Sequence, residues 1–598
     1  MEPSERTVKD ETPSEHLSRL EVGWLFVAVL AMILLRVFAL DSDAFPHLSW
    51  SSALLTDEGF YIHNARNVAL FHHATTDQFN NMLIMPTLHW VQMQVFAHFG
   101  SGSVQARSIS VVAGLLTLPV LFYALKASFG VRVAAVALLF CGLGHANLMY
   151  SRMALMDPSA ALLMVCSFAI WSAGVQSHQR GKPRSMLLFA ACGALLSVVY
   201  ITRGLSAFII PIGPCLMLVR ARTASDAADK SAWYRDTGSL FLGLALGMTV
   251  YLKAWYLPHH AEISRMTHYY LSVQLAPHSL GALRMNIVRA AFGDFRGMSH
   301  YLFAHSAVEF GLCVSVIGAF FSKGRIGLSA KLFAARHGAD EVWSQMCGWF
   351  MVLWLLCAWS VYACASYAPD RYYVLFYPAM CSIAALALCR IRVLRVALEG
   401  GWARTAIAAF LVFHFTETLL HHQEDWLVAG MVLLAIGVYS PYVHSAFDAV
   451  LRILAPAPLL VIWGLVHLGW TGNWLVHMSY LRRDVDHWLQ KSLPAGSVII
   501  GDVAPGLCLD NHFVAVNVIP GLCNYDRPLE QFSGHPLYVA ILDQRMVERY
   551  WRKQYPDLLT VERRIALFPN MLNRPVGVFR VDLAPPPNGA LPVPGQAH

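Results

Sequence analysis

The sequence predicts a polytopic α-helical membrane protein that carries a small C-terminal α/β domain outside the membrane. Its 598 residues are 56% hydrophobic and only 14% charged, with a mean hydropathy of +0.48. A soluble protein of this length carries about a quarter charged residues. Apolar stretches close to the roughly 20 residues that cross a bilayer as a helix recur along residues 1–470. We therefore interpret residues 1–470 as a transmembrane module.

About thirteen segments are predicted to span the membrane. The connections at 126–132, 176–184, 220–235, 322–338 and 390–404 are rich in arginine and lysine, which places them in the cytoplasm together with the N-terminus. No small-residue cleavage site follows the first apolar run, so that run is interpreted as a retained anchor. An odd number of spans places the C-terminal region outside. The predicted spans lie near 22–40, 104–125, 133–150, 158–176, 185–201, 205–220, 238–256, 301–321, 344–364, 373–389, 404–420, 426–440 and 455–470.

Three outer segments are too long to be turns. Residues 41–103 and 257–300 are expected to form interfacial helices that flank the active site. Residues 471–584 are expected to form the outer α/β domain, and the proline-rich residues 585–598 a disordered tail. Within the outer domain, apolar runs bounded by turn residues predict strands at 496–503, 535–543 and 576–583, and a helix at 544–556.

The net charge of +7 does not indicate a nucleic-acid partner, because the basic residues are dispersed in short clusters between the spans. Most of the 12 cysteines lie in or beside apolar spans, where cysteine behaves as a small hydrophobe. Only Cys508 and Cys523 lie in a polar outer region. A disulfide between them and two unpaired buried thiols are equally compatible with the sequence.

Two adjacent carboxylates, Asp57 and Glu58, follow the first span in the stretch "LLTDEGFYIHNARN" (54–67). Charge at the membrane level is costly unless it is paired or faces water, so these residues are candidates for a functional site. The alternative is a helix start, in which Thr56 or Asp57 caps the helix and the acidic residues offset its dipole.

Other outer segments each bring an arginine to the membrane boundary, although arginine clusters are expected on the cytoplasmic side. Any one of them is more often structural, but a set of guanidiniums beside carboxylates can hold a phosphate and a nucleophile together. The residues are Arg152 and Asp157 in "YSRMALMDPSA" (150–160), Arg203 in "YITRGLSAF" (200–208), and Arg371, Tyr372 and Tyr373 in "YAPDRYYVLFYP" (367–378).

These stretches resemble a known family. "DEGFYIHNARN" after the first span, "SRMALMD" before the fourth and "TRG" before the sixth are similar to the polyprenyl-phosphate-dependent membrane glycosyltransferases of the type-C fold. That group includes protein O-mannosyltransferase-like enzymes and the bacterial aminoarabinose transferases of lipid A. The resemblance covers roughly the first 220 residues and, more loosely, "DRYYVLFYP". It implies about a dozen or more spans and an optional outer C-terminal domain.

The resemblance also implies roles for individual residues. Asp57 falls at the catalytic aspartate, which accepts the proton of the acceptor nucleophile, and Glu58 is its substrate-orienting neighbour. Arg152 falls on the arginine of the family's "SR…LLD" stretch, and Arg203 is similar to a contact for the lipid phosphate. The remaining expected substrate contacts are Asp157, Arg371, Tyr372, Tyr373 and Arg66.

One departure from the family pattern lies in the first outer loop. Many relatives have a lysine or histidine before two prolines there, whereas this chain has "NMLIMPTLHW" (81–90) with no lysine. This argues against a lysine that clamps the phosphate, and His89 is the residue that could compensate. No cofactor is required by the proposed chemistry. A divalent metal is compatible with the sequence but unsupported, because the adjacent histidine pairs at 72–73, 259–260 and 421–422 lack metal-ligand spacing.

The sequence therefore predicts a glycosyltransferase in the plasma membrane that uses a polyprenyl-phosphate-linked sugar and a lipid, glycan or protein acceptor. Asp57 would act as general base in a single inverting displacement. The absence of a glycine-rich phosphate loop in the sequence fits a donor without a nucleotide. The alternative is a transporter or flippase of a lipid-linked glycan, which would place its charges near the bilayer midplane. A non-catalytic scaffold would leave the outer arginines unexplained.

Overall fold

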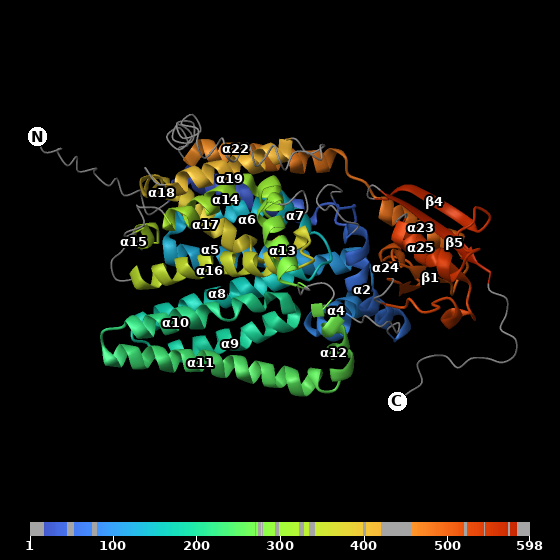
Figure 1. Cartoon of the computed structure of the whole chain (residues 1–598), viewed down its shortest axis with the longest axis horizontal. Coiled ribbons are helices and arrows are strands. Elements are labelled where there is room, and N and C mark those ends of the chain that lie inside the picture. Colours follow the sequence, from blue (N-terminus) through green and yellow to red (C-terminus); the bar gives the residue numbers. More distant parts are fainter. Residues whose placement is uncertain are drawn as a thin grey trace, which may run out of the picture.

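The protein has a mostly helical body with a small sheet domain at one end, as Figure 1 shows. The described chain begins at the far end of the body from the sheet domain. This arrangement confirms the predicted fold class. The computed structural model describes residues 17–44, 53–73, 81–269, 271–272, 277, 279–292, 298–321, 328–333, 341–398, 402–419, 456–519, 523–542, 545–571 and 574–582.

Nine helical segments within these ranges are long and apolar enough to cross a membrane. Shorter apolar helices match three further predicted spans, and the span predicted at 426–440 lies outside the described residues, so the count of thirteen stays a prediction. The helices of the body are α1 (Arg19–Val37), α5 (Ser103–Phe129), α6 (Val131–Leu143), α7 (His145–Tyr150), α8 (Asp157–Gln179), α9 (Ser185–Thr202), α10 (Ile212–Thr223), α11 (Ala227–Tyr251), α14 (Met298–Phe320), α15 (Leu328–Leu332), α16 (Glu341–Cys364), α17 (Tyr377–Cys389), α18 (Ile391–Leu398), α19 (Trp402–Leu419) and α22 (Pro456–Val476).

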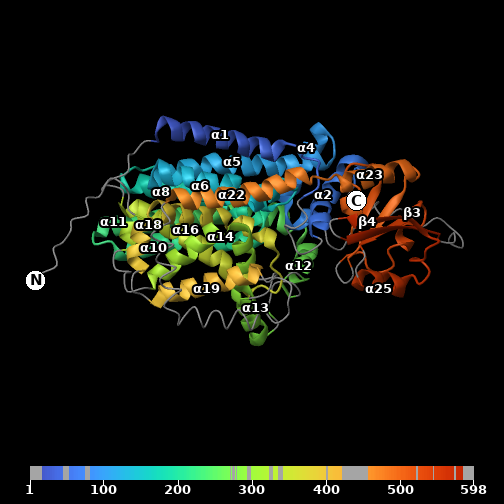
Figure 2. The ribbon, with the colours of Figure 1, turned by 90° about the horizontal axis from the view of Figure 1, so that it is seen from above.

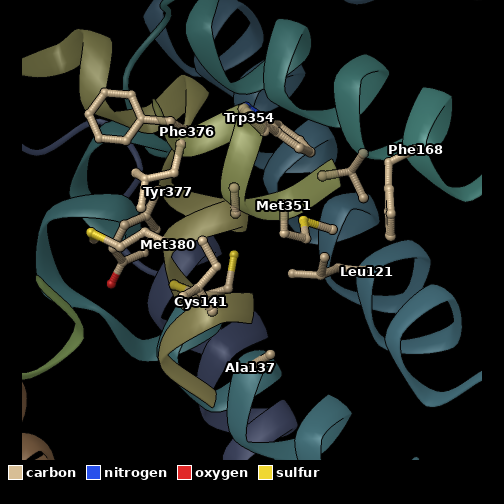
Figure 3. Packing of buried hydrophobic residues seen from close by; sticks show 14 of the residues in the cluster. Leu121, Ala137, Cys141, Phe168, Met351, Trp354, Phe376, Tyr377 and Met380 are labelled. Atoms are coloured by element: carbon tan, nitrogen blue, oxygen red, sulfur yellow. The ribbon is translucent and has the colours of Figure 1, made fainter. Parts of the chain in front are cut away.

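Helix α17 lies at the centre of the body and α1 at its edge. From Tyr377 to Leu388 every residue of α17 is buried, and the helix packs against α6, α14 and α16. Figure 3 shows Met380 of α17 beside Cys141 of α6. Helix α1 starts in a capping box between Ser18 and Glu21 and runs along the outside of the body (Figure 2). Only 11% of the apolar 18-residue stretch of α1 is buried by protein, as expected for a helix that faces lipid.

Shorter helices occupy the end of the body nearest the sheet domain (Figure 1). They come from the outer segments in which interfacial helices are predicted. The 3-10 helices η1 and η6 follow α9 and precede α17. The bounds are α2 (Ala53–Phe71), α3 (Asn81–Ile84), α4 (Pro86–Phe99), α12 (His260–Tyr269), α13 (Leu280–Phe292), η1 (Gly204–Ile209) and η6 (Asp370–Leu375).

The C-terminal domain is built on a five-stranded sheet of order β2-β1-β3-β5-β4. Strand β1 pairs in parallel with β2 and β3, while β5 pairs antiparallel with β3 and β4. Helices α23 and α24 pack on one face and α25 on the other. The bounds are α23 (Leu481–Ser492), β1 (Val498–Gly501), α24 (Ala504–Leu507), β2 (Val514–Asn517), η7 (Glu530–Phe532), β3 (Leu537–Leu542), α25 (Arg545–Gln554), β4 (Arg564–Met571) and β5 (Arg574–Val581).

The predicted strands at 496–503, 535–543 and 576–583 correspond to β1, β3 and β5, and the predicted helix to α25. Strands β2 and β4 and helix α23 were not predicted. Cys508 and Cys523 are both buried, and no disulfide joins them. Of the two alternatives, the structure therefore favours two buried thiols over a disulfide.

Candidate active site

The two neighbouring carboxylates lie inside α2 and not at its start. The helix begins at Ala53, and its first turn contains no acidic residue. The helix-cap alternative for Asp57 and Glu58 is therefore wrong. Consecutive residues of an α-helix point about 100° apart, because the helix has about 3.6 residues per turn. The two side chains accordingly meet different partners.

Glu58 is fully engaged by protein. Its carboxylate accepts two hydrogen bonds from Arg107, at 2.8 Å from Nε and 2.6 Å from Nη2, and a third from the Ala154 N–H at 2.8 Å. The side chain is 2% exposed. Burial works to raise the pKa of Glu58, but the charge and hydrogen bonds of Arg107 outweigh it, so the pKa lies below its usual value. Glu58 is an ionised anchor of α2.

The side chain of Asp57 is more exposed than that of Glu58, and its pKa shifts in the opposite direction. Its Oδ2 lies 2.7 Å from Nη1 of Arg371, and 16% of its side chain is exposed. Burial raises the pKa of Asp57, and the charges of Arg371 and Arg203 offset this only in part; Asp157 and Glu58 raise the pKa further. The pKa of Asp57 therefore lies above its usual value, which makes it the more basic of the two carboxylates.

A second ion pair lies beside the first. Asp157, the first residue of α8, has its Oδ1 3.1 Å from Nη1 of Arg203, which lies between α9 and η1. The ring of Tyr372 joins the two pairs, because the guanidinium carbon of Arg203 lies 4.4 Å from its centroid and that of Arg371 lies 5.2 Å from it. Asp57, Asp157, Arg203, Arg371 and Tyr372 thus form one cluster, which we call the carboxylate–guanidinium cluster.

Three of the residues expected in the site lie elsewhere. Arg152 donates to the carbonyls of Leu35, Arg36 and Ala39 at the end of α1, and its guanidinium stacks on Trp474. These carbonyls at a helix C-terminus attract a cation, so Arg152 ties α1 to α7 and α22. The structure thus does not bring Arg152 into the cluster, and a contact between Arg152 and the substrate stays a prediction.

The other two residues that lie outside the cluster are Arg66 and Tyr373. Arg66 donates to the carbonyls of Asn511 and Phe513, so it joins α2 to the outer domain. Tyr373 is 2% exposed and packs against the ring of Tyr377 in the core of the body, with centroids 4.9 Å apart. Neither residue belongs to the cluster, because packing and carbonyl partners already occupy both side chains.

Sequence reasoning missed three residues that complete the site. Arg107 lies at the outer end of a predicted span, and the rule that selected the other arginines would have found it. Tyr61 lies one helical turn after Asp57 and is close enough to Arg371 and Asp57 to feel their charges. The Tyr367 hydroxyl is hydrogen-bonded to Arg371, and burial raises the pKa of Tyr367 to about 12, so this hydroxyl remains protonated.

The structure also shows how candidate metal ligands and His89 are placed. Within the part of the chain that is described, no three His, Cys, Asp or Glu residues are grouped to hold a metal ion. The histidine pair at 421–422 lies outside that part. Burial lowers the pKa of His89 to about 4, so this histidine is neutral and does not supply the charge of the missing lysine.

The spanning helices, the interfacial helices and the outer sheet domain have the architecture of the type-C membrane glycosyltransferases. A family model described as dolichyl-phosphate-mannose-protein mannosyltransferase matches residues 83–263. ArnT from Cupriavidus metallidurans in its apo state has a TM-score of 0.52 and 18% identity, over 94% of this chain and 98% of that chain. The family match and the shared fold confirm the resemblance found in the sequence and indicate a membrane glycosyltransferase.

Two further structures are similar at lower scores. ArnT from the same organism bound to undecaprenyl phosphate has a TM-score of 0.49 and 18% identity, over 94% of this chain and 97% of that chain. AglB from Archaeoglobus fulgidus, an archaeal oligosaccharyltransferase in complex with an inhibitory peptide and a dolichol-phosphate, has a TM-score of 0.44 and 12% identity, over 89% and 70%. No curated protein matches this chain significantly in sequence.

Proposed function

We propose that this protein transfers a sugar from a polyprenyl-phosphate-linked donor to an acceptor on the extracytoplasmic side of the plasma membrane. The observation that carries the proposal is the carboxylate–guanidinium cluster, in which Arg203 and Arg371 flank the partly exposed Asp57. The matching family model is named after a dolichyl-phosphate-linked sugar, which supports a lipid-linked donor. A lipid, a glycan or a protein can serve as acceptor.

The reaction is a single displacement at the anomeric carbon. Asp57 accepts the proton of the attacking hydroxyl or amine, the new glycosidic bond forms, and the bond from the anomeric carbon to the lipid-phosphate oxygen breaks with inversion. Negative charge grows on the leaving phosphate. The guanidiniums of Arg203 and Arg371 are held in place before the reaction, so they stabilise this charge without reorganisation.

Binding of the donor would also prepare the base. In the structure Arg371 pairs with Asp57, and its charge lowers the pKa of that carboxyl. A phosphate that accepts hydrogen bonds from Arg371 competes with Asp57 for the same guanidinium. Asp57 then becomes more basic at the moment when the donor is in place. Glu58 keeps its Arg107 partner throughout and serves to position α2.

The central test is the substitution Asp57→Asn. We expect turnover to fall by about 10²- to 10⁴-fold, the range for loss of a general base, while the donor still binds. The measurement is sugar transfer by the purified protein from polyprenyl-phosphate-linked sugars. Mass spectrometry of lipid and glycan fractions from cells with and without the protein identifies the sugar and acceptor to use.

A matched control is Asp582→Asn, which removes one carboxylate that is 57% exposed on the outer domain. This variant should transfer sugar at the wild-type rate. Full turnover by Asp57→Asn would show that another group is the base. A protein that binds and translocates lipid-linked glycans without any transfer would favour the flippase alternative.

A further inference from the structure

The outer domain touches α2 at the residue that follows the two carboxylates. A Cβ on Gly59 would lie 2.2 Å from the backbone nitrogen of Gly506 and 2.4 Å from the carbonyl carbon of Pro505. Real Cβ atoms are not found this close to backbone, so only glycine at position 59 permits the contact between α2 and α24. Two turns further along α2, Arg66 donates to Phe513 and Asn511. The same helix is therefore held at two places by residues 504–515 of the outer domain.

A second connection runs through the start of α5. The carboxylate of Asp510, in the outer domain, accepts hydrogen bonds from the N–H of Ser103 at 2.8 Å and from its hydroxyl at 3.0 and 2.8 Å. Ser103 is the first residue of α5, and no side-chain cap is present within the helix itself. Asp510 thus satisfies one of the N–H groups that a helix N-terminus leaves open, and its charge opposes the positive end of the dipole.

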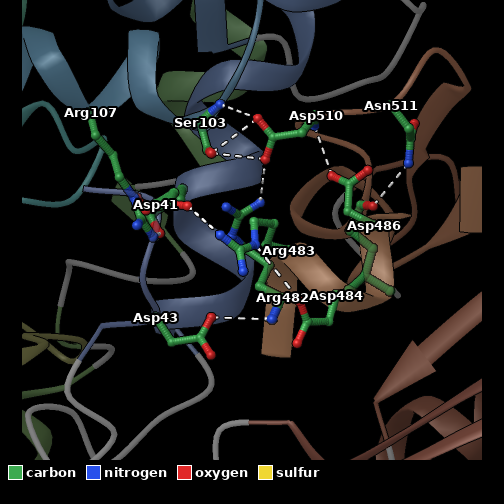
Figure 4. A network of polar contacts seen from close by, with 12 residues as sticks. Asp41, Asp43, Ser103, Arg107, Arg482, Arg483, Asp484, Asp486, Asp510 and Asn511 are labelled. Carbon is green, nitrogen blue, oxygen red and sulfur yellow. Dashed lines mark hydrogen bonds and ion pairs between the residues drawn. The ribbon is translucent and has the colours of Figure 1, made fainter. Parts of the chain in front are cut away.

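Asp510 is held by Arg482 and Asp486 of the outer domain, and α23, which carries both residues, is bound in turn to the chain after α1 (Figure 4). Nη1 of Arg482 lies 3.2 Å from its Oδ2, and the N–H of Asp510 donates to Asp486 at 2.8 Å. Asp43 accepts from the backbone N–H groups of Leu481 and Arg482. Arg482 and the hydrogen bonds from Ser103 outweigh the effect of burial, so the pKa of Asp510 lies below its usual value and this carboxylate is charged.

The path from Asp510 to the site is short. Ser103 opens the first turn of α5, and Arg107, one turn later, grips Glu58 with two hydrogen bonds. Nη1 of Arg107 donates to the carbonyls of Leu40 and Ser42, which follow α1. Glu58 precedes Gly59 and follows Asp57. The outer domain therefore contacts both helices that fix the backbone of Asp57.

We propose that Asp510 is a positioning residue: the outer domain, through Asp510 at the N-terminus of α5 and Gly506 against Gly59, holds α2 so that Asp57 meets the acceptor nucleophile. This proposal rests on the proposed function, because it concerns the same base. The alternative role for the outer domain is to bind or select the acceptor. Positioning acts on turnover, whereas selection of the acceptor acts on the KM for the acceptor.

The experiment compares Asp510→Ala, Asp510→Asn and Asp582→Ala in the full-length protein. Misplacement of a reacting group by about 1 Å costs about 10²-fold, so kcat of Asp510→Ala should fall by about 10- to 100-fold. KM for donor and acceptor should each change less than about threefold. Asp510→Asn keeps an oxygen that accepts from the Ser103 N–H, so its kcat should lie between those of the alanine variant and the wild type. Asp582→Ala should behave as wild type.

A second readout needs no substrate. Amide hydrogen exchange of residues 53–71 in the full-length protein should be faster in Asp510→Ala than in wild type, and unchanged in Asp582→Ala. If Asp510→Ala does not fold, Ser103→Ala removes only the hydroxyl bond at the same contact and should change both readouts in the same direction.

Unchanged exchange in α2, or a raised acceptor KM at full kcat, would overturn the positioning role. If the wild type transfers no sugar from a lipid-linked donor, the proposed function fails, and the exchange measurement still decides whether Asp510 holds α2. The two failures are thereby distinguishable.

Discussion

Asp57 and Glu58 are chemically similar neighbours whose surroundings give them different tasks. Glu58 is closed off by Arg107 and the Ala154 N–H, whereas Asp57 is partly exposed and pairs with Arg371. The pKa is lowered in the first and raised in the second. A pair of carboxylates with diverging pKa values is a frequent sign of divided roles in catalysis.

The pH dependence of the reaction follows from the raised pKa of Asp57. A general base acts in its ionised form, so kcat/KM should rise with pH through a midpoint above 3.8, the ordinary value of an aspartate. Arg371 lowers the pKa of Asp57, and Arg371→Gln should therefore move the midpoint to higher pH. The measurement is the pH–rate profile of both proteins, in which the midpoint is read independently of the overall loss of rate. A midpoint that stays or falls would contradict the assignment.

At the residue scale, the sequence could identify candidate arginines for the site, but it could not show which of them face the carboxylates. Arg203, Arg371 and Arg152 all lie at the outer boundary of a span, and the pattern treats them alike. What separates them is the partner that folding provides: Arg203 and Arg371 face carboxylates, whereas Arg152 faces the free carbonyls at the end of α1. Those partners come from distant segments, so local sequence cannot reveal them.

At the scale of the elements, long apolar helices are predictable because lipid demands that backbone groups be satisfied within the helix. Strands β2 and β4 were not predicted, each for its own reason. Strand β2 has only four residues, and β4 contains Pro569 and an irregular register with β5. Helix α2 was expected in the interface, yet residues 61–67 are all buried, and their apolar side chains pack with residues of α4, α5 and the outer domain. Such burial of a polar helix depends on tertiary contacts.

The buried ion pair between Glu58 of α2 and Arg107 of α5 gives a prediction at this scale. Glu58→Gln removes one partner of a buried ion pair and leaves Arg107 uncompensated, which costs about 3–5 kcal/mol of unfolding free energy. The double variant Glu58→Gln with Arg107→Gln should recover part of that loss, because no buried charge is then unpaired. Thermal unfolding in detergent measures both. Additive losses in the double variant would indicate that the pair is not coupled.

At the scale of the whole molecule, the outer domain is joined to the membrane body by direct contacts with α2 and α5. Residues 504–515 follow β1 and lie against α2, so a change in the sheet domain reaches the site through α24. The sequence indicated a separate outer domain from its change in composition. It could not indicate the glycine contact or the Asp510 cap, because both join residues about 400 or more positions apart.

We expect Asp502 to make the stability of the outer domain depend on pH. It follows β1 directly, accepts a hydrogen bond from the Leu542 N–H at 3.3 Å, and burial raises its pKa from 3.8 to about 7. A carboxyl with a raised pKa in the folded state binds its proton more tightly there than in the unfolded chain. Its stabilising contribution is complete below about pH 4 and is lost as pH rises through about 7. The outer domain should therefore become less stable from pH 5 to pH 8.

The substitution Asp502→Asn tests this directly. The amide keeps an acceptor for the Leu542 N–H but has no charge to desolvate, so the variant should gain in Tm relative to wild type as pH rises from 5 to 8. Because α24 starts two residues later and packs on α2, the variant should also retain faster turnover than wild type above pH 7. Asp582→Asn, an exposed control, should show neither change. A Tm difference that is constant across this range would mean that Asp502 is ionised in the folded protein throughout.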